Sequence, residues 1–140
     1  MILGIGKDLL DMRRFEKTLE KYGERFIGKT FTDAEIAEAS RRRDAGKMME
    51  TYAKRCAAKE AASKALGTGI AEGVRLKDIG VTNTDRGAPK LTLTGGALAQ
   101  LKALVPNGME AHIHITLTDE PPLAEAMVII EALPISAKIG

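Results

Sequence analysis

Hydrophobic and polar residues in the first half of the chain predict one apolar strand followed by helices. Residues 1–12 are apolar enough for a buried strand, and such strands usually lie in the centre of a sheet. Apolar positions three and four residues apart predict a helix from Arg13 to Tyr22, which Gly23 can end. The segment Thr32 to Glu35 has the capping-box signature and starts a second helix that runs to about residue 42.

The second half of the chain follows a long central helix. This helix is predicted from about Met48 to Leu66, with Gly67 as its left-handed stop. Period-two patterns and turn residues then predict, in order, a strand over 78–84, a hairpin-like connection over 85–89, a strand over 90–94, a helix over 96–105, and strands over 110–118 and 124–133. The pattern predicts an α+β fold, a small, mainly antiparallel sheet packed against a long central helix, in a single domain spanning residues 1–140.

The composition fits an intracellular enzyme. With 44% hydrophobic and 29% charged residues, 140 residues suffice to bury a core. A single cysteine, Cys56, excludes an intramolecular disulfide and suits a reducing compartment. No apolar run approaches the roughly 20 residues that span a membrane, and the charges of Lys7, Asp8 and Asp11 argue against a signal peptide. We therefore expect a cytoplasmic protein without a membrane partner.

The charge distribution favours an acidic protein partner over nucleic acid. A net charge of +2 is small, and 4% aromatic residues without tryptophan offer little surface for base stacking, so we expect no nucleic-acid partner. The basic residues nevertheless cluster, at Arg13 and Arg14 and again at Arg41 to Arg43. The second cluster is equally compatible with a solvated helix end and with docking of an acidic partner.

The carboxylate of Glu60 needs an explanation, because it lies on an apolar stripe of the central helix. The stripe is formed by Ala53, Cys56, Ala57, Glu60 and Lys64, and should face the interior. An acid there needs a cation, a donor or a proton, and an ion pair with Lys64 meets that need without any function. A second acid, Asp8, interrupts the N-terminal strand. If the two acids meet, a hard divalent cation held by oxygens is the economical way to neutralise both, but spacing alone does not show that they meet.

Two segments resemble those of a known family. Residues 4–9 and 55–70 are similar to the paired motifs of the bacterial holo-acyl-carrier-protein synthases, which are small 4′-phosphopantetheinyl transferases. The resemblance covers nearly the whole chain, and it includes Arg14, the 31–35 segment, the turn 87–89, and the closing strands around 116–118 and 126–131. The family commonly has Ser or Thr and then His after the penultimate strand. This chain has Thr118, Asp119 and Glu120, so no role of that His is transferred.

The resemblance implies a reaction and a set of ligands. A serine of apo-acyl carrier protein attacks the β-phosphate of coenzyme A, which yields holo-acyl carrier protein and 3′,5′-ADP for fatty acid biosynthesis. Mg²⁺ held by Asp8 and Glu60 is required, and Mn²⁺ can substitute for it. Glu60 and Lys64 are the implied catalytic residues. The serine proton goes either to Glu60 or to a metal-bound water, and the sequence does not separate the two.

The resemblance also implies which residues bind coenzyme A and the carrier protein. Coenzyme A contacts are implied for Arg55, Lys64, Gly67, Thr68, Gly87 and Pro89. Arg14 is placed like an arginine that contacts the acidic carrier protein, and members of the family form homotrimers with active sites at subunit interfaces. Lys59, about 100° around the helix from Glu60, is either a further phosphate contact or solvated.

Other interpretations stay open at this point. One is a non-catalytic module that recognises a nucleotide or an acidic protein through its arginines, and another is a divergent relative that binds coenzyme A without turnover, because of Asp119. His112 and His114 share a strand face but lack a third ligand, so we expect hydrogen-bonding groups and no metal pair. Cys56, flanked by alanine, is expected to pack as a small hydrophobe.

Overall fold

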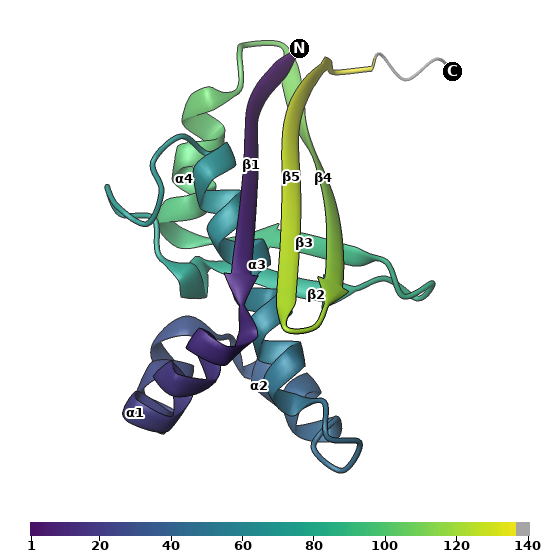
Figure 1. Cartoon of the computed structure of the whole chain (residues 1–140). Helices are drawn as coiled ribbons and strands as arrows, with labels where there is room; N and C mark the ends of the chain where they lie inside the picture. Colours follow the sequence, from purple (N-terminus) through teal and green to yellow (C-terminus); the bar gives the residue numbers. More distant parts are fainter. Residues whose placement is uncertain (137–140) are drawn as a thin grey trace.

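The computed structural model describes residues 1–136, and in that range the chain folds into helices around two antiparallel sheets (Figure 1). The larger sheet has the strand order β1-β5-β4, with β1 at Ile2–Asp11, β4 at Met109–Glu120 and β5 at Leu123–Pro134. The smaller sheet pairs β2, Ile79–Asn83, with β3, Pro89–Leu93. The helices are α1 (Met12–Thr30), α2 (Asp33–Arg41), α3 (Met48–Ala65), α4 (Gly95–Leu104) and a 3₁₀ turn η1 (Leu76–Asp78). The α+β fold with a long central helix is confirmed.

The central helix α3 is buried on most of its surface, because small side chains let other elements approach it closely. Five of its alanines are at most 2% exposed and belong to the main core: Ala57, Ala58, Ala61, Ala62 and Ala65. Strand β1 crosses directly over this surface. A Cβ atom at Gly6 would lie 1.8 Å from the carbonyl oxygen of Ala61, and one at Gly4 would lie 1.8 Å from that of Ala65. The two glycines thus permit backbone contact between β1 and α3.

Helix α1 extends beyond its predicted end. Gly23 interrupts it at φ 53° and ψ −136°, but the chain resumes helical geometry and continues to Thr30. The added turns place Phe26 in edge-to-face contact with Phe15, at 5.8 Å between ring centroids, and with Phe31, at 6.3 Å. Gly23 therefore ends the first helical stretch as predicted, whereas the second stretch after the kink, which packs through Phe26, was not predicted.

Strand β1 was expected to be central, and in the chain it is an edge strand, because β5 lies between β1 and β4. Its inward face packs on α3, while Ile5 and Leu9 on the outward face are 59% and 61% exposed. The apolar character of the strand therefore has two origins. One face belongs to the core and the other forms an apolar surface of the sheet.

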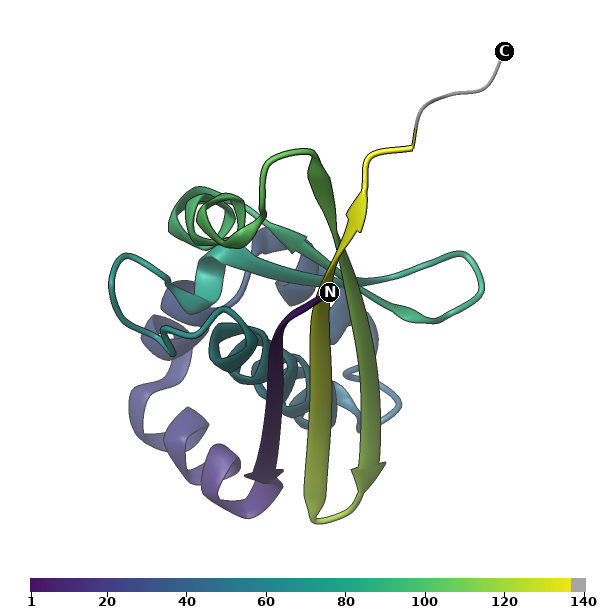
Figure 2. The same ribbon diagram turned by 90° about the horizontal axis from the view of Figure 1, so that it is seen from above.

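The other element boundaries agree with the predicted ones to within a few residues. Thr32 and Glu35 form the reciprocal capping box at the start of α2, and Gly67 has φ +85° directly after the end of α3. The turn between β2 and β3 extends beyond β4 in both views (Figures 1 and 2). Within residues 1–136, none of the helices is both long and apolar enough to cross a membrane.

Candidate functional site

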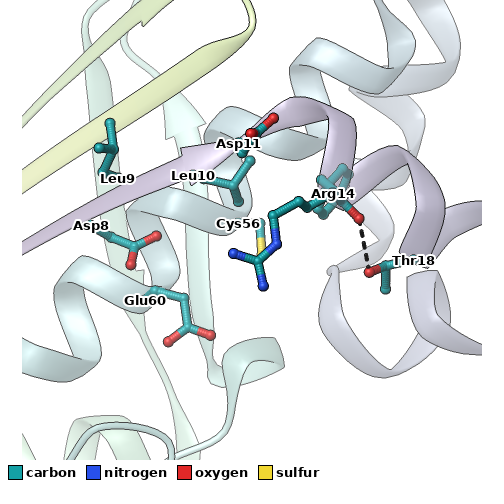
Figure 3. A pocket seen from close by; sticks show the side chains of 9 residues that line it. Asp8, Leu9, Leu10, Asp11, Arg14, Thr18, Cys56 and Glu60 are labelled. Carbon is teal, nitrogen blue, oxygen red and sulfur yellow. Dashed lines mark hydrogen bonds between the residues drawn. The ribbon is translucent and has the colours of Figure 1, made fainter.

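Asp8 and Glu60, the two acids singled out above, line the same cavity. The cavity has a volume of about 300 Å³, and its polar lining comes from Asp8, Asp11, Arg14, Thr18 and Glu60. Figure 3 shows both carboxylates directed to the same space, with the Arg14 side chain extending toward it from α1. The structure therefore brings together the predicted metal ligands and the predicted docking arginine.

Backbone contact between β1 and α3 explains why these acids meet. Gly6 allows β1 to lie on the Ala61 carbonyl, so that Asp8, two residues further, lies beside the helix. Glu60 is half-buried on α3, where the buried stripe of the helix opens to the surface at Glu60 and Lys64. The stripe was expected to face the interior throughout, and it does so only as far as Ala57.

The acids differ in their partners. Lys64 Nζ donates a hydrogen bond to Asp8 Oδ1 at 3.0 Å and another to the carbonyl oxygen of Lys7 at 3.1 Å. In the described part of the chain, Glu60 has no cation within 4.0 Å, so the Glu60–Lys64 ion pair considered above does not form. Burial, followed by the nearby Asp8 charge, raises the pKa of Glu60, while Lys64 partly opposes this.

The donor set fits a magnesium ion. Within residues 1–136 no cluster of three or more His, Cys, Asp or Glu side chains converges on one point, so an all-protein cage is not formed there. Mg²⁺ instead uses one or two carboxylates and keeps several of its waters. Glu60 is half-buried, has no cation within 4.0 Å in residues 1–136, and lies next to Asp8. Two such carboxylates match this mode of Mg²⁺ binding.

A second cavity, of about 270 Å³, contains Arg55. It is lined also by Glu38, Arg41 and Asn83, and it shares no lining residue with the Asp8 and Glu60 cavity. Arg55 is only 5% exposed, and its Nε makes no hydrogen bond to any described residue. Burial lowers the pKa of Arg55, and the nearby charge of Glu35 opposes this. Of the Arg41 to Arg43 cluster, only Arg41 lines this cavity, and the side chains of Arg41 and Arg43 are exposed at the end of α2.

The remaining residues predicted to bind coenzyme A lie in two further places. Gly67 and Thr68 form the turn after α3, close in sequence to Lys64. Gly87, at φ +84°, lies in the turn between β2 and β3, and Pro89 lines a cavity of about 550 Å³ between that hairpin and β4. One chain therefore distributes these residues over several separate regions.

Lys59 occupies a position that the sequence did not predict. It was expected to contact phosphate or to be solvated, and both expectations were wrong, since its side chain is 0% exposed and forms an ion pair of 2.7 Å with Glu35. The capping-box signature identified Glu35 as a helix-start residue, but it gave no signal for a buried partner 24 positions later.

The other candidate side chains have the structural roles expected for them. His114 hydrogen-bonds with Glu131 across strands at 2.8 Å, and His112 lies 3.3 Å from Glu110. Cys56 is buried, and burial together with the Glu60 and Asp8 charges raises the pKa of its thiol to about 12, so it is not a nucleophile.

Comparisons with known proteins agree over the full chain. The model of the 4′-phosphopantetheinyl transferase superfamily matches residues 4–118. A holo-[acyl-carrier-protein] synthase of Sinorhizobium fredii is 54% identical over 140 residues, which is 100% of this chain and 99% of the relative. One from Caulobacter vibrioides is 57% identical over 134 residues, 96% of this chain and 98% of the relative.

Solved structures give the same result. The crystal structure of holo-[acyl-carrier-protein] synthase from Neisseria meningitidis has a TM-score of 0.79 at 34% identity, covering 94% of this chain and 99% of that chain. A Bacillus anthracis holo-(acyl-carrier-protein) synthase in complex with CoA (3′,5′-ADP) has a TM-score of 0.70 at 34% identity, covering 93% and 96%.

The fold and the paired acids define a transferase, and the chain belongs to the 4′-phosphopantetheinyl transferase superfamily. Within that superfamily it belongs to the holo-[acyl-carrier-protein] synthases. It is therefore an enzyme that transfers phosphopantetheine from coenzyme A to acyl carrier protein.

Proposed function

We propose that residues 1–140 act as one phosphopantetheinyl transferase domain that depends on Mg²⁺, or Mn²⁺ in its place, held by Asp8 and Glu60. The observation that carries this proposal is the shared cavity of the two acids, in which Glu60 has no cation within 4.0 Å among residues 1–136. Asp8 and Glu60 would hold the divalent cation, which would supply positive charge to the pyrophosphate of coenzyme A.

The protein side chains position the reacting groups. Asp8 and Glu60 orient the cation site through β1 and α3, whose backbones are in direct contact at Gly6. Lys64, half-exposed and 3.0 Å from Asp8, is close enough to exchange this partner for the departing phosphate. The turn formed by Gly67 and Thr68 lets the substrate pyrophosphate approach the backbone.

Arg55 contributes a phosphate contact from the second cavity. The buried Nε of Arg55, which makes no hydrogen bond to a described residue, gains a charge-assisted hydrogen bond when an anion enters, and coenzyme A carries a 3′-phosphate. Gly87 and Pro89 contact the adenosine portion. The complex of the Bacillus anthracis relative with CoA (3′,5′-ADP) supports a nucleotide ligand of this kind.

The enzyme acts as a homotrimer with active sites between subunits. Residues assigned to coenzyme A line separate cavities in one chain, so a neighbouring subunit brings the second set onto the same substrate molecule. On the outward face of the three-stranded sheet, the exposed side chains of Ile5, Leu9 and Met127 supply apolar contacts beside the Lys7–Glu125 ion pair.

The carrier protein docks along α1. Arg14 lines the Asp8 and Glu60 cavity, and Lys17 and Lys21 follow it at helical spacing before the kink at Gly23. A basic helix beside the acidic cavity attracts an acidic partner and brings its serine near the bound cation. We place this reaction in the cytoplasm.

The test is intact-mass analysis of apo-acyl carrier protein incubated with the enzyme and coenzyme A. We expect the mass of one phosphopantetheine group to be added with Mg²⁺ or Mn²⁺, and no addition with a chelator. The Glu110→Gln variant is the matched control, because its exposed carboxylate pairs with His112 outside the cavity lining, and it should react like the wild type. Full addition in the presence of chelator would exclude the metal-dependent mechanism.

A further inference from the structure

The buried Lys59–Glu35 pair lies next to the arginine cavity. Lys59 follows Arg55 by one helical turn, so the two cations share a face of α3. Glu35 Oε2 accepts a hydrogen bond at 2.8 Å from the backbone N–H of Val81, a residue that lines the same cavity as Arg55. The pair therefore forms part of the support of the cavity wall.

All hydrogen-bonding capacity of the Lys59 ammonium is used within this pair and its surroundings. Lys59 Nζ donates to Glu35 Oε1 at 2.7 Å, to the carbonyl oxygen of Ile79 at 2.7 Å and to that of Leu76 at 3.1 Å. Glu35 Oε1 also accepts from the backbone N–H of Thr32 at 2.8 Å. Both side chains are 0% exposed, so neither reaches solvent or ligand.

The two acids whose charges raise the pKa of Arg55 are both paired with other cations. Glu35 is held by Lys59, and Glu38 is held by Arg41 and Arg42. Arg55 forms no ion pair within residues 1–136, although the charges of Glu35 and Glu38 act on its pKa. Because Lys59 is paired with Glu35, and Arg41 and Arg42 with Glu38, neither acid is paired with Arg55. The buried Nε of Arg55 therefore makes no hydrogen bond to any described residue.

We propose that Lys59 is a positioning residue for the phosphate contact: it keeps Glu35 from neutralising Arg55, so the second cavity stays available to a phosphate group. This inference rests on the proposed role of Arg55 in binding coenzyme A. Without Lys59, the buried carboxylate of Glu35 lacks a counterion, and Arg55, on the same helix face, is the cation available to it. An arginine engaged in this way no longer attracts phosphate.

The experiment is calorimetric titration of 3′,5′-ADP into the wild type, Lys59→Met, the double variant Glu35→Gln/Lys59→Met, and Arg55→Gln. Circular dichroism confirms folding at the titration temperature. We expect Lys59→Met to raise the Kd about tenfold or more, which is the loss of one charged hydrogen bond. The double variant removes the competing charge as well, so it should recover to within about threefold of the wild type.

Ile130→Ala controls for stability alone, because Ile130 is a buried core residue of β5 outside the lining of the Arg55 cavity. It should lower the Tm and leave the Kd unchanged. A wild-type Kd in Lys59→Met, or a double variant as weak as the single one, overturns the role of Lys59 and leaves the proposed function intact. If the wild type and Arg55→Gln bind 3′,5′-ADP equally, the assignment of Arg55 fails, and this inference with it.

Discussion

Helix α3 carries three lysines that each pair with a carboxylate from a distant part of the chain, and of these Lys59 and Lys64 differ most in burial. Lys59 and Glu35 are 2.7 Å apart and 0% exposed, with every polar atom satisfied. Lys64 and Asp8 are 3.0 Å apart, and the lysine side chain is 50% exposed. Five residues along one helix therefore separate a fixed ion pair from one whose lysine can change partners.

The difference teaches how burial assigns a role to the same chemical pair. A desolvated pair is costly to separate, so Lys59 and Glu35 fix α3 against α2 and β2. A half-exposed pair contributes little to stability, and in the proposed mechanism Lys64 leaves Asp8 for the phosphate. That mechanism assigns structure and catalysis to adjacent turns of one helix.

The largest effect should come from removing the metal ligands. Asp8→Asn and Glu60→Gln keep side-chain size but weaken a hard-cation ligand, so turnover should fall roughly a hundredfold or more while the fold is retained. Steady-state transfer rates at saturating Mg²⁺, with circular dichroism spectra beside them, measure both properties. Near wild-type turnover in either variant would place the metal elsewhere.

Breaking each lysine pair should separate stability from activity. Lys59→Met leaves a buried carboxylate without its counterion and should lower the free energy of unfolding by about 3 to 5 kcal/mol. Lys64→Met should change it by less than about 1 kcal/mol, yet slow transfer about tenfold or more. Urea unfolding and transfer assays on both variants provide the test, and equal stability losses would contradict the contrast between the pairs.

The pH dependence of stability should reveal the raised pKa of Glu60. Burial and Asp8 raise the folded-state pKa of Glu60 above its usual 4.5, so between the two values the folded protein binds more protons than the unfolded one. The stability of the metal-free enzyme therefore falls as pH rises through this window, whereas Glu60→Gln lacks this loss. With chelator present, Glu60→Gln should have the higher Tm near neutral pH, and the two should converge below about pH 4.5. If the difference in Tm between the wild type and Glu60→Gln stayed constant across pH, the effect would come from packing and not from the titration of Glu60.

The smallest effect concerns docking. Arg14→Glu places like charge against an acidic carrier protein, so the apparent KM for the carrier should rise several-fold while coenzyme A binding is unchanged. Added salt should slow the reaction of the wild type more than that of the variant, because screening limits the range of interaction between surface charges to about 8 Å at physiological ionic strength. An unchanged carrier KM together with weaker coenzyme A binding would move Arg14 to the nucleotide site.

Local patterns in the sequence predicted most of the fold. The Thr32 and Glu35 capping box and the Gly67 stop fixed helix boundaries, because these signals depend on neighbouring residues only. The position of β1 at a sheet edge could not be predicted, since an apolar strand has the same pattern in the centre of a sheet and at an exposed apolar face. The helix beyond Gly23 was missed because its support, the edge-to-face packing of Phe26 against Phe15 and Phe31, is tertiary.

The sequence also predicted part of the candidate site. Asp8 and Glu60 stood out as acids among apolar residues, and the family resemblance paired them. The Glu35–Lys59 pair could not be predicted, because a lysine beside Glu60 on a helix has the same local pattern whether it is solvated or buried. Its burial depends on carbonyl oxygens of Leu76 and Ile79, which only the folded chain brings to it.

The measurement that tests the central claim most directly is an EPR titration of Mn²⁺ into the enzyme without substrates. The account predicts that the wild type and the Glu110→Gln control bind Mn²⁺, and that Asp8→Asn and Glu60→Gln bind it at least about tenfold more weakly. Equal Mn²⁺ affinity in the wild type and both acid variants would contradict it, because the shared cavity of Asp8 and Glu60 would then not be the metal site.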